Sequence, residues 1–363
     1  MFIIEKPYAS ELIFDTILQN DWWVLDNQAV RDAEIEEGAL RLITSNQAKD
    51  YYLKQKEPGL RGAFKGLIKP QHKIIHAVSD LSFHIDDGEI VGFIGPNGAG
   101  KSTTIKMMTG ILTPTKGHVL IDGRDITKHR KEVVQNIGVV FGQRSQLNWD
   151  LRLGESFELL KHIYQIDQAD YDRTLDELDQ ILGIKEIIDK PVRQMSLGQR
   201  MKGDLVASMI HSPKVLFLDE PTIGLDVSAK FALRKFIKEI NKVRKTTVIL
   251  TTHDLGDIQE LCERLIIINH GVMMEDGNLT QIVDRIAPYK TLVVEYYDEI
   301  APEHGRCEML EHTGNVAKYR FMKEEVTAAE IIADISKIKT IKDISIEEAG
   351  IDDIIKIAYG QSG

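Results

Sequence analysis

The chain has 363 residues, 43% of them hydrophobic, which is enough for one large domain and one or two smaller pieces. No apolar run approaches the roughly 18 residues of a membrane helix, and the amino terminus lacks the features of a signal peptide, so we expect a cytoplasmic protein. A net charge of −11 disfavours nucleic acid and anionic lipid as main partners. Membrane attachment would therefore have to run through another protein.

The two cysteines, Cys262 and Cys307, have neither the number nor the spacing of a disulfide framework or a metal site, so we expect both to be packing residues. Residues 1–38 form an amino-terminal extension, and the pattern of the first forty or so residues predicts a strand, a helix and a second strand. They contain no chemical motif, and the sequence assigns them no role.

Five short apolar runs without polar alternation predict strands buried on both faces of a parallel sheet. These runs span residues 89–95, 136–142, 214–220, 246–252 and 263–269. Helical patterns separate them, as in residues 228–243, where apolar side chains recur at helical spacing. The stretch at about 149–212 has helical patterns and no strand signal, so we expect a helical subdomain inserted into an α/β core.

The residues from 290 to 363 have a different pattern, which predicts a small separate α+β domain. Its expected elements are strands at 291–297 and 317–322, a helix at 327–338, a strand at 341–346 and a helix at 351–359. The larger domain would then occupy residues 39–287.

The stretch "GPNGAGKST" follows the first apolar run and opens a helical pattern, which is the context in which GxxxxGK[ST] forms a phosphate-binding loop. Its glycines let the backbone fold around an anion with N–H groups pointing inward. We expect Lys101 to reach the β and γ phosphates, Ser102 to supply a hydroxyl to Mg²⁺, and Thr103 with the helix dipole to favour the α and β phosphates. The alternative is a glycine-rich turn that binds nothing. The expected nucleotide-binding residues here are Gly95, Pro96, Asn97, Gly98, Ala99, Gly100, Lys101, Ser102 and Thr103.

Two carboxylates end the most apolar strand, in "KVLFLDEP". If this strand neighbours the phosphate loop, both lie beside it, with Asp219 in the Mg²⁺ shell and Glu220 polarising the water that attacks the γ phosphate. A solvated Asp-Glu pair before a proline turn is the ordinary alternative. The phosphate loop in the same chain favours the catalytic interpretation.

Two further polar residues follow predicted strands. His253 in "TTVILTTHDL" can donate to a γ phosphate oxygen, although a lone histidine after a strand is more often a packing or capping residue. The amide of Gln143 in "GVVFGQRSQL" can bridge the metal and the attacking water, although an exposed loop glutamine is the default. The carboxyl ends of strands are the edge where open α/β sheets bind ligands, which favours the functional interpretation for both.

The ordered set of phosphate loop, Gln143, "MSLGQ", "LFLDEP", "GLD" and "TTHD" resembles the nucleotide-binding subunit of ABC transporters, over roughly residues 40–285. Within that family the "SLGQR" segment is most similar to the drug-export branch, which includes the daunorubicin-type and sodium-export ATPases. The resemblance implies a P-loop NTPase of ABC type, with a RecA-like core, an antiparallel β subdomain and an inserted helical subdomain. It also implies ATP and Mg²⁺ as cofactors.

In that family the signature helix caps the γ phosphate of ATP held by a second ATP-binding subunit, which we expect to be an identical chain. A helix start with Ser196, Gly198 and Gln199 suits this task, because it offers a hydroxyl, close backbone approach and a positive dipole end. Asp226 would lie at the dimer seam. The resemblance further implies integral membrane permease subunits as partners, no nucleic acid, and a place on the inner face of the plasma membrane. The carboxy-terminal domain would aid dimerisation or regulation.

Three departures from the family pattern stand out. The usual LSGGQ signature has Leu197 in place of one glycine. The adenine-stacking aromatic fits Tyr51 in "AKDYY", with Tyr52 as its rival. An insertion at 57–73 has apolar and basic residues on opposite flanks of a helical pattern, which fits a solvated surface helix better than a contact with membrane or permease.

Two other functions share many of these motifs. One is a soluble ABC ATPase acting on ribosomes or DNA, which usually has two cassettes or a long coiled coil within the cassette, neither of which this sequence contains. The other is the ATPase subunit of an importer, which only the resemblance to the export branch disfavours. We therefore expect an exporter subunit.

Overall fold

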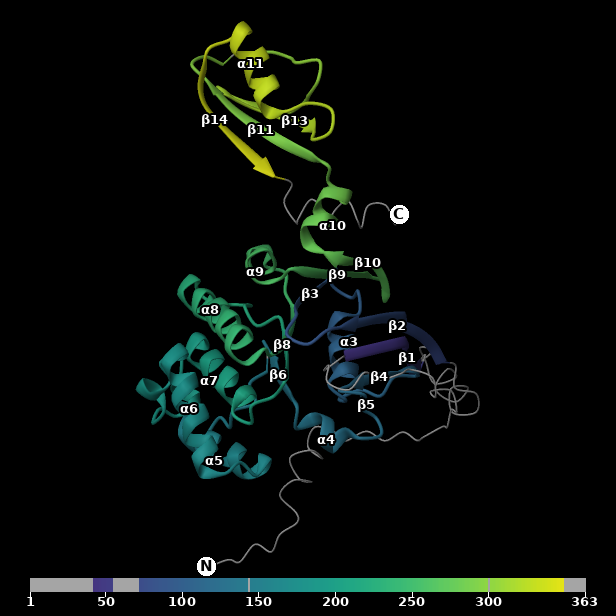
Figure 1. Ribbon diagram of the computed structural model, residues 1–363, viewed down its shortest axis with the longest axis vertical. Coiled ribbons are helices and arrows are strands. Elements are labelled where there is room, and N and C mark those ends of the chain that lie inside the picture. The colour runs from purple at the N-terminus through teal and green to yellow at the C-terminus, as the bar shows by residue number, and fades with distance from the viewer. Residues whose placement is uncertain (1–41, 55–71, 143, 300, 349–363) are drawn as a thin grey trace, which may run out of the picture. The chain divides into compact units, whose positions relative to one another are not determined.

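The computed structural model describes residues 42–54, 72–142, 144–299 and 301–348 (Figure 1). The chain divides into two units, one formed by the residues up to 90 together with 102–252, the other by 91–101 together with 253 onward. The predictions for residues 1–38, for residues 57–71 of the insertion at 57–73 and for a helix at 351–359 lie outside the described residues, and the last two residues of the insertion begin β2 (His72–Ile85).

The first unit contains three parallel strands that carry the predicted apolar runs. Strand β7 (Val215–Asp219) lies between β6 (Ile137–Phe141) and β8 (Thr247–Thr251), with Phe141 opposite Asp219 and Asp219 opposite Thr251. Every residue of β7 and β8 is buried, as continuous apolar strands require. The carboxyl ends of the three strands are thus in register at one edge.

An antiparallel sheet forms the second layer of this unit. It has the order β2-β1-β4-β5, from β1 (Leu42–Lys54), β2 (His72–Ile85), β4 (Lys116–Ile121) and β5 (Arg124–Asp125). The parallel strands and this sheet match the predicted α/β core and antiparallel β subdomain.

Helices make up the remainder of the first unit. Between β6 and β7, the described residues form no strand, only helices and turns, as the sequence pattern predicts, and α5 and α6 pack against α7 (Figure 1). The helices of this unit are α3 (Lys101–Met108), α4 (Arg130–Val134), α5 (Leu153–Tyr164), α6 (Gln168–Leu182), α7 (Leu197–Met209) and α8 (Val227–Arg244).

In the second unit, β3 (Ile90–Ile94) pairs in parallel with β9 (Arg264–Asn269) from Val91 onward. Strand β10 (Val272–Asn278) returns antiparallel to β9 and leads into α10 (Leu279–Ile286), while α9 (Leu255–Leu261) precedes β9. The loop after β3 is tied to this layer, because the Gly271 N–H donates to the carbonyl oxygen of Ala99 at 2.8 Å.

A second antiparallel sheet follows α10, with the order β12-β13-β11-β14. Its elements are β11 (Tyr289–Tyr296), β12 (Glu308–Thr313), β13 (Val316–Met322), α11 (Ala328–Ile338) and β14 (Ile341–Glu348). The sequence pattern predicts all of them except β12. That strand reads EMLEHT and is largely exposed at the edge of the sheet, so it lacks the apolar alternation on which strand prediction depends.

The core of this sheet contains a directed pair of tyrosine hydroxyls. The Tyr319 hydroxyl donates to the carbonyl oxygen of Pro302 at 2.9 Å, so the Tyr296 hydroxyl, 2.9 Å away, donates to Tyr319. Both side chains are fully buried. Tyr319 is therefore the acceptor on which Tyr296 depends, and Tyr319 has an acceptor of its own.

This direction predicts unequal effects for two conservative substitutions. Tyr319→Phe leaves the Tyr296 hydroxyl buried without its acceptor, so we expect a loss of about 1–3 kcal/mol in the stability of the sheet. Tyr296→Phe leaves Tyr319 bonded to Pro302 and should cost less, about 0.5–1.5 kcal/mol. Hydrogen exchange of the β11 and β13 amides in the full chain measures both. Equal losses would contradict the assigned direction.

Candidate functional site

The loop between β3 and α3 folds back on its own lysine. Lys101, the first residue of α3, is 5% exposed, and its Nζ donates to the carbonyl oxygens of Gly95 at 2.7 Å and Pro96 at 3.2 Å. Gly98 and Gly100 have φ angles of 83° and 105°, which L side chains rarely adopt. The loop therefore has the glycine-dependent curvature that the sequence predicts for a phosphate cradle, and Asn97 is exposed on it.

Ser102, the residue after Lys101, forms a hydrogen bond with Asp219, the last residue of β7. The Ser102 hydroxyl donates to Oδ1 of Asp219 at 3.2 Å, and the Thr251 hydroxyl donates to the same oxygen at 2.6 Å. Thr103 follows in α3 and is half-buried. Two hydroxyls thus converge on one buried carboxylate, which is 9% exposed.

Thr251 is a site residue that sequence reasoning missed. It lies opposite Asp219 in the parallel register, and its oxygens also accept from the Glu220 N–H, the carbonyl at 2.9 Å and the hydroxyl at 3.0 Å. The available signal was its position, because it is the last residue but one of the strand predicted at 246–252 and lies two residues before His253.

Glu220 has an unusual backbone held from both sides. Its φ is 54°, a left-handed conformation that costs a non-glycine residue about 1 kcal/mol or more. On the β6 side, the Gly142 N–H donates to the Asp219 carbonyl at 2.8 Å, and a Cβ on Gly142 would lie 2.0 Å from the Glu220 carbonyl oxygen. The contacts of Gly142 and Thr251 therefore fix the peptide that joins the two carboxylates.

Some of the predicted site residues are described only in part or not at all. Gln143 lies outside the described residues. Tyr51 and Tyr52 pair along β1 with Ile75 and Ile74, but their side chains lie outside the described part of the chain. His253 is exposed and begins the second unit, directly after Thr252, so its position relative to Glu220 is not described.

The second predicted helix start is observed at α7. Ser196 is its N-cap, with Oγ accepting from the Gln199 N–H at 3.2 Å, while Oε1 of Gln199 accepts from the Ser196 N–H at 3.1 Å. Lys190 Nζ donates to the same Gln199 oxygen at 2.9 Å. This capping box leaves Ser196 exposed at the tip of the helix.

The start of α8 lies beside the start of α7. Asp226 caps α8 by accepting from the Ala229 N–H at 2.8 Å, and a Cβ on Gly198 would lie 3.1 Å from the Cβ of Ala229. Leu197, the departure from the family signature, directs its side chain at Gly224, where an added Cβ would lie 3.0 Å from Leu197 Cδ2. Gly198, Ser196 and Asp226 are therefore brought together.

An exposed apolar patch surrounds these helix starts. Its members are Leu197, Ile223, Val227 and Phe231, which are 37%, 40%, 84% and 65% exposed. Large apolar side chains grouped on a surface are typical of a protein–protein contact.

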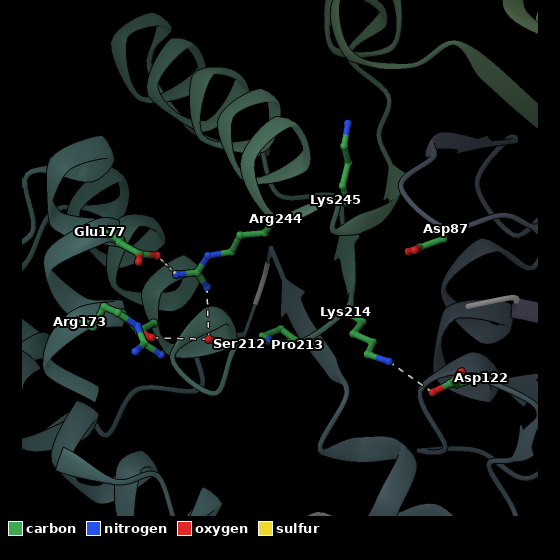
Figure 2. Close-up of a pocket in the computed structure, with 10 residues that line it drawn as sticks. Asp87, Asp122, Arg173, Glu177, Ser212, Pro213, Lys214, Arg244 and Lys245 are labelled. Atoms are coloured by element: carbon green, nitrogen blue, oxygen red, sulfur yellow. Dashed lines mark hydrogen bonds and ion pairs between the residues drawn. The ribbon is translucent and has the colours of Figure 1, made fainter. Parts of the chain in front are cut away.

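A charged cleft of about 630 Å³ lies at the opposite, amino ends of β7 and β8 (Figure 2). Lys214 directly precedes β7 and Lys245 lies two residues before β8, whereas the carboxylates end β7. Figure 2 shows the Arg244 guanidinium between Glu177 and Ser212, with Nη2 2.5 Å from the Glu177 carboxylate. The Arg244 cation is already paired with Glu177, and the cleft lies at the amino ends of the strands and not at the carboxyl ends. We therefore do not assign the nucleotide to this cleft.

Two searches of the described residues bear on membranes and metals. None of the described helices is long and apolar enough to cross a membrane. In the same residues no group of three or more His, Cys, Asp or Glu side chains forms a metal cluster. Mg²⁺ in phosphate sites usually takes one or two protein oxygens and completes its shell with phosphates and water. The hydroxyl of Ser102 and the carboxylate of Asp219, 3.2 Å apart, fit that donor set.

The fold and the phosphate loop define a P-loop ATPase, and comparisons with known proteins specify its family. A family model described as ABC transporter matches residues 78–223. The ABC transporter ATP-binding protein NatA of Bacillus subtilis is 32% identical over 212 residues, 58% of this chain and 86% of that protein. This chain belongs to the ABC transporter ATP-binding proteins and is an ABC-type ATPase.

Two further likenesses agree. The methionine import ATP-binding protein MetN of Geobacillus kaustophilus is 32% identical over 212 residues, 57% of this chain and 62% of that protein. A solved structure of the ATP-binding subunit of an ABC transporter has a TM-score of 0.57 at 26% identity, covering 67% of this chain and 92% of that one. The predicted family and fold class are confirmed, whereas the drug-export branch stays a prediction.

The close approach at Gly142 predicts a large effect from one methyl group. Gly142→Ala places a Cβ against the Glu220 carbonyl, so β6 or β7 must shift, and we expect a loss of about 1–3 kcal/mol in the free energy of unfolding. Gly305→Ala is the matched control, because a Cβ there meets no atom within 4 Å. Urea denaturation compares the two variants. Equal midpoints would contradict the close contact between Gly142 and the Glu220 carbonyl.

Proposed function

We propose that this ATPase is the energy-supplying subunit of an ABC exporter, working as a pair of identical chains on a separate membrane permease. The observation that supports this best is the Ser102–Asp219 contact directly after the lysine of the phosphate loop. Ser102 directly follows that lysine in the chain, and the Asp219 carboxylate that it contacts is followed by a second carboxylate, Glu220, whose backbone is fixed by Gly142 and Thr251. That is the set of groups needed to bind a nucleoside triphosphate and transfer its terminal phosphoryl group to water.

We assign the nucleotide's phosphates to residues 95–103 and its adenine to the Tyr51 position. Lys101 supplies positive charge, and the N–H groups of the loop supply donors. When bound, Mg²⁺ neutralises phosphate charge, and Ser102, Asp219 and Gln143 would hold it. Glu220 orients and deprotonates the attacking water, and His253 donates to the γ phosphate.

The α7 tip supports a site completed by a second chain. Ser196 and Gly198 are accessible at a helix start, beside Asp226 and inside the exposed apolar patch. Closure of two chains would cover this patch and bring each α7 tip to the phosphate loop of the other chain. The hydroxyl, the close backbone approach and the helix dipole would then act on the γ phosphate from the far side.

We further propose the domain division of the sequence, with residues 39–287 as the ATPase domain, its helical subdomain at about 149–212, and residues 290–363 as a domain that aids dimerisation or regulation. The permease places the pair at the inner face of the plasma membrane. Export is favoured by the resemblance of the signature segment. Import is the rival, supported by the likeness to a protein named for methionine import.

Purification of the tagged chain from detergent-solubilised membranes tests the transport function. A recurrent multi-helix membrane partner supports it, whereas ribosomal proteins would indicate the soluble ABC class. Reconstitution of the chain with that partner, followed by the direction of ATP-dependent substrate movement across the vesicle, separates export from import.

Glu220→Gln should separate binding from hydrolysis. The amide keeps the size of the side chain but cannot take a proton, so we expect ATP binding to persist while turnover falls about a hundredfold or more. ATP should then trap a dimer on a sizing column. Glu186→Gln, at an exposed residue of the helical region, is the control and should behave like wild type. Near-normal hydrolysis by Glu220→Gln would remove Glu220 from the catalytic role.

Ser196→Arg tests the shared site. The long cation should block closure at the α7 tip, so we expect loss of cooperative ATPase activity with ATP binding retained. Because arginine also removes the N-cap, Ser196→Asp serves as a second variant that keeps the cap but sets a negative charge against phosphate. Ser345→Arg, on the exposed face of β14, controls for the added charge. Unchanged cooperativity in both Ser196 variants would count against a paired site.

A further inference from the structure

A buried carboxylate lies in the helix that begins at the candidate signature. Asp204 is in the third turn of α7 and is 6% exposed, among residues that are otherwise mainly apolar or small. Burial raises the pKa of this carboxyl to about 6, against hydrogen bonds and the charge of Arg200 on the same helix, which lower it. A buried ionisable group is costly, so its partners must account for it.

The partners of Asp204 all come from the segment that follows β6. Its Oδ1 accepts from the Ser145 hydroxyl at 2.9 Å and from the Gln146 N–H at 3.0 Å. The Gln146 side-chain amide donates in return to the Asp204 carbonyl at 3.0 Å. The Leu147 N–H completes the set by donating to the Ser145 hydroxyl at 3.2 Å. The Asp204 carboxylate therefore holds Ser145 and Gln146 directly, and Leu147 through the Ser145 hydroxyl.

Gly203, the residue before Asp204, leaves room for apolar side chains from the same part of the chain. A Cβ on Gly203 would lie 2.8 Å from Cδ1 of Leu147 and 2.8 Å from Cδ1 of Leu153. Leu147 is 6% exposed and Leu153 is fully buried. Only a glycine lets these leucines pack directly on the α7 backbone, so polar and apolar contacts fix the segment at the same turn of the helix.

The far end of α7 is tied to the same strand. A Cβ on Gly138 in β6 would lie 2.4 Å from the Ser208 carbonyl oxygen, and Nε2 of His211 donates to the Ile137 carbonyl at 3.0 Å. Strand β6, the segment after it and α7 are thus joined at both ends. A shift of the segment would have to move the helix with it.

We propose that Asp204 is a positioning residue for ATP hydrolysis, which couples the segment after β6 to the helix tip at Ser196. The inference rests on the proposed function, in which the end of β6 faces the nucleotide of its own chain and Ser196 faces that of the partner. Asp204 contacts neither nucleotide. It acts by keeping two phosphate-facing elements in one relative position, and a misplacement of about 1 Å can lower a rate a hundredfold.

Asp204→Asn and Asp204→Ala in the full chain test this coupling. Asn keeps the shape but carries no charge, and Ala removes every side-chain contact to the segment. We expect Asn to lower kcat about tenfold with KM for ATP within about twofold, because ground-state binding is untouched. In the Ala variant, the Gln146 and Leu147 amides should exchange hydrogen about tenfold faster. Ser208→Ala is the control, since its buried hydroxyl donates only within α7, to Leu205 at 2.8 Å.

A pH profile separates coupling from a merely structural role. Above pH 6 the wild-type carboxylate is ionised and accepts from both Ser145 and Gln146, whereas below it the protonated carboxyl loses part of this capacity. The segment contributes only neutral donors, and Arg200 is the charged group acting on Asp204. The ratio of wild-type kcat to that of Asp204→Asn should therefore be about ten at pH 7.5 and fall toward one below pH 5.5.

The outcomes decide between the two proposals. A wild-type rate in Asp204→Asn with the same pH profile would overturn the coupling and leave the proposed function standing. A wild-type chain that lacks ATPase activity would overturn both. Should Asp204→Ala fail to fold, the kcat, KM and pH profile of Asp204→Asn still decide. A tenfold lower kcat that does not vary in ratio with pH would also count against the role assigned to the charge.

Discussion

The rest of the structure depends on one peptide, the one that joins Asp219 to Glu220. Gly142, directly after β6, donates to it, and Thr251, at the end of β8, accepts from it. These hydrogen bonds hold Glu220 in a left-handed backbone conformation. Its side chain therefore leaves the strand in a direction different from that of Asp219. In a regular strand the side chain after Asp219 would point to the opposite face of the sheet, and the left-handed backbone at Glu220 changes that direction.

Close backbone contacts also fix α7, the helix that begins at the candidate signature. Gly138 and His211 fix the carboxy-terminal end of α7 to β6, and the buried carboxylate of Asp204 fixes the helix to the segment after β6. The free end of α7 is the exposed tip at Ser196. A helix anchored along its length and open at its start is suited to presenting that start to another molecule. The capping box pairs the N–H groups of Ser196 and Gln199, so the helix start is formed before any partner arrives.

Much of this was predictable from sequence, for identifiable reasons. Strand–loop–helix context identified Lys101 and Ser102, and continuous apolar runs identified β7 and β8, because these features depend on local pattern. The residues that were missed depend on register and packing between elements. Thr251 matters because it lies opposite Asp219, and Asp204 because two loop residues, Ser145 and Gln146, donate to it. Strand β12 has an edge position and a polar sequence, so no periodicity marks it.

The leucine that departs from the family signature has its own structural counterpart. Leu197 packs over Gly224, whose φ of 73° and missing side chain leave room for it. The two positions therefore form a matched pair, one at the start of α7 and the other in the turn before α8. Transplanting the usual glycine signature into this chain would remove this contact and part of the exposed apolar patch, and transferring Leu197 into a relative with a larger residue at the facing position would create a clash. Exchange of signature segments between such ATPases should succeed only when both segments are exchanged together.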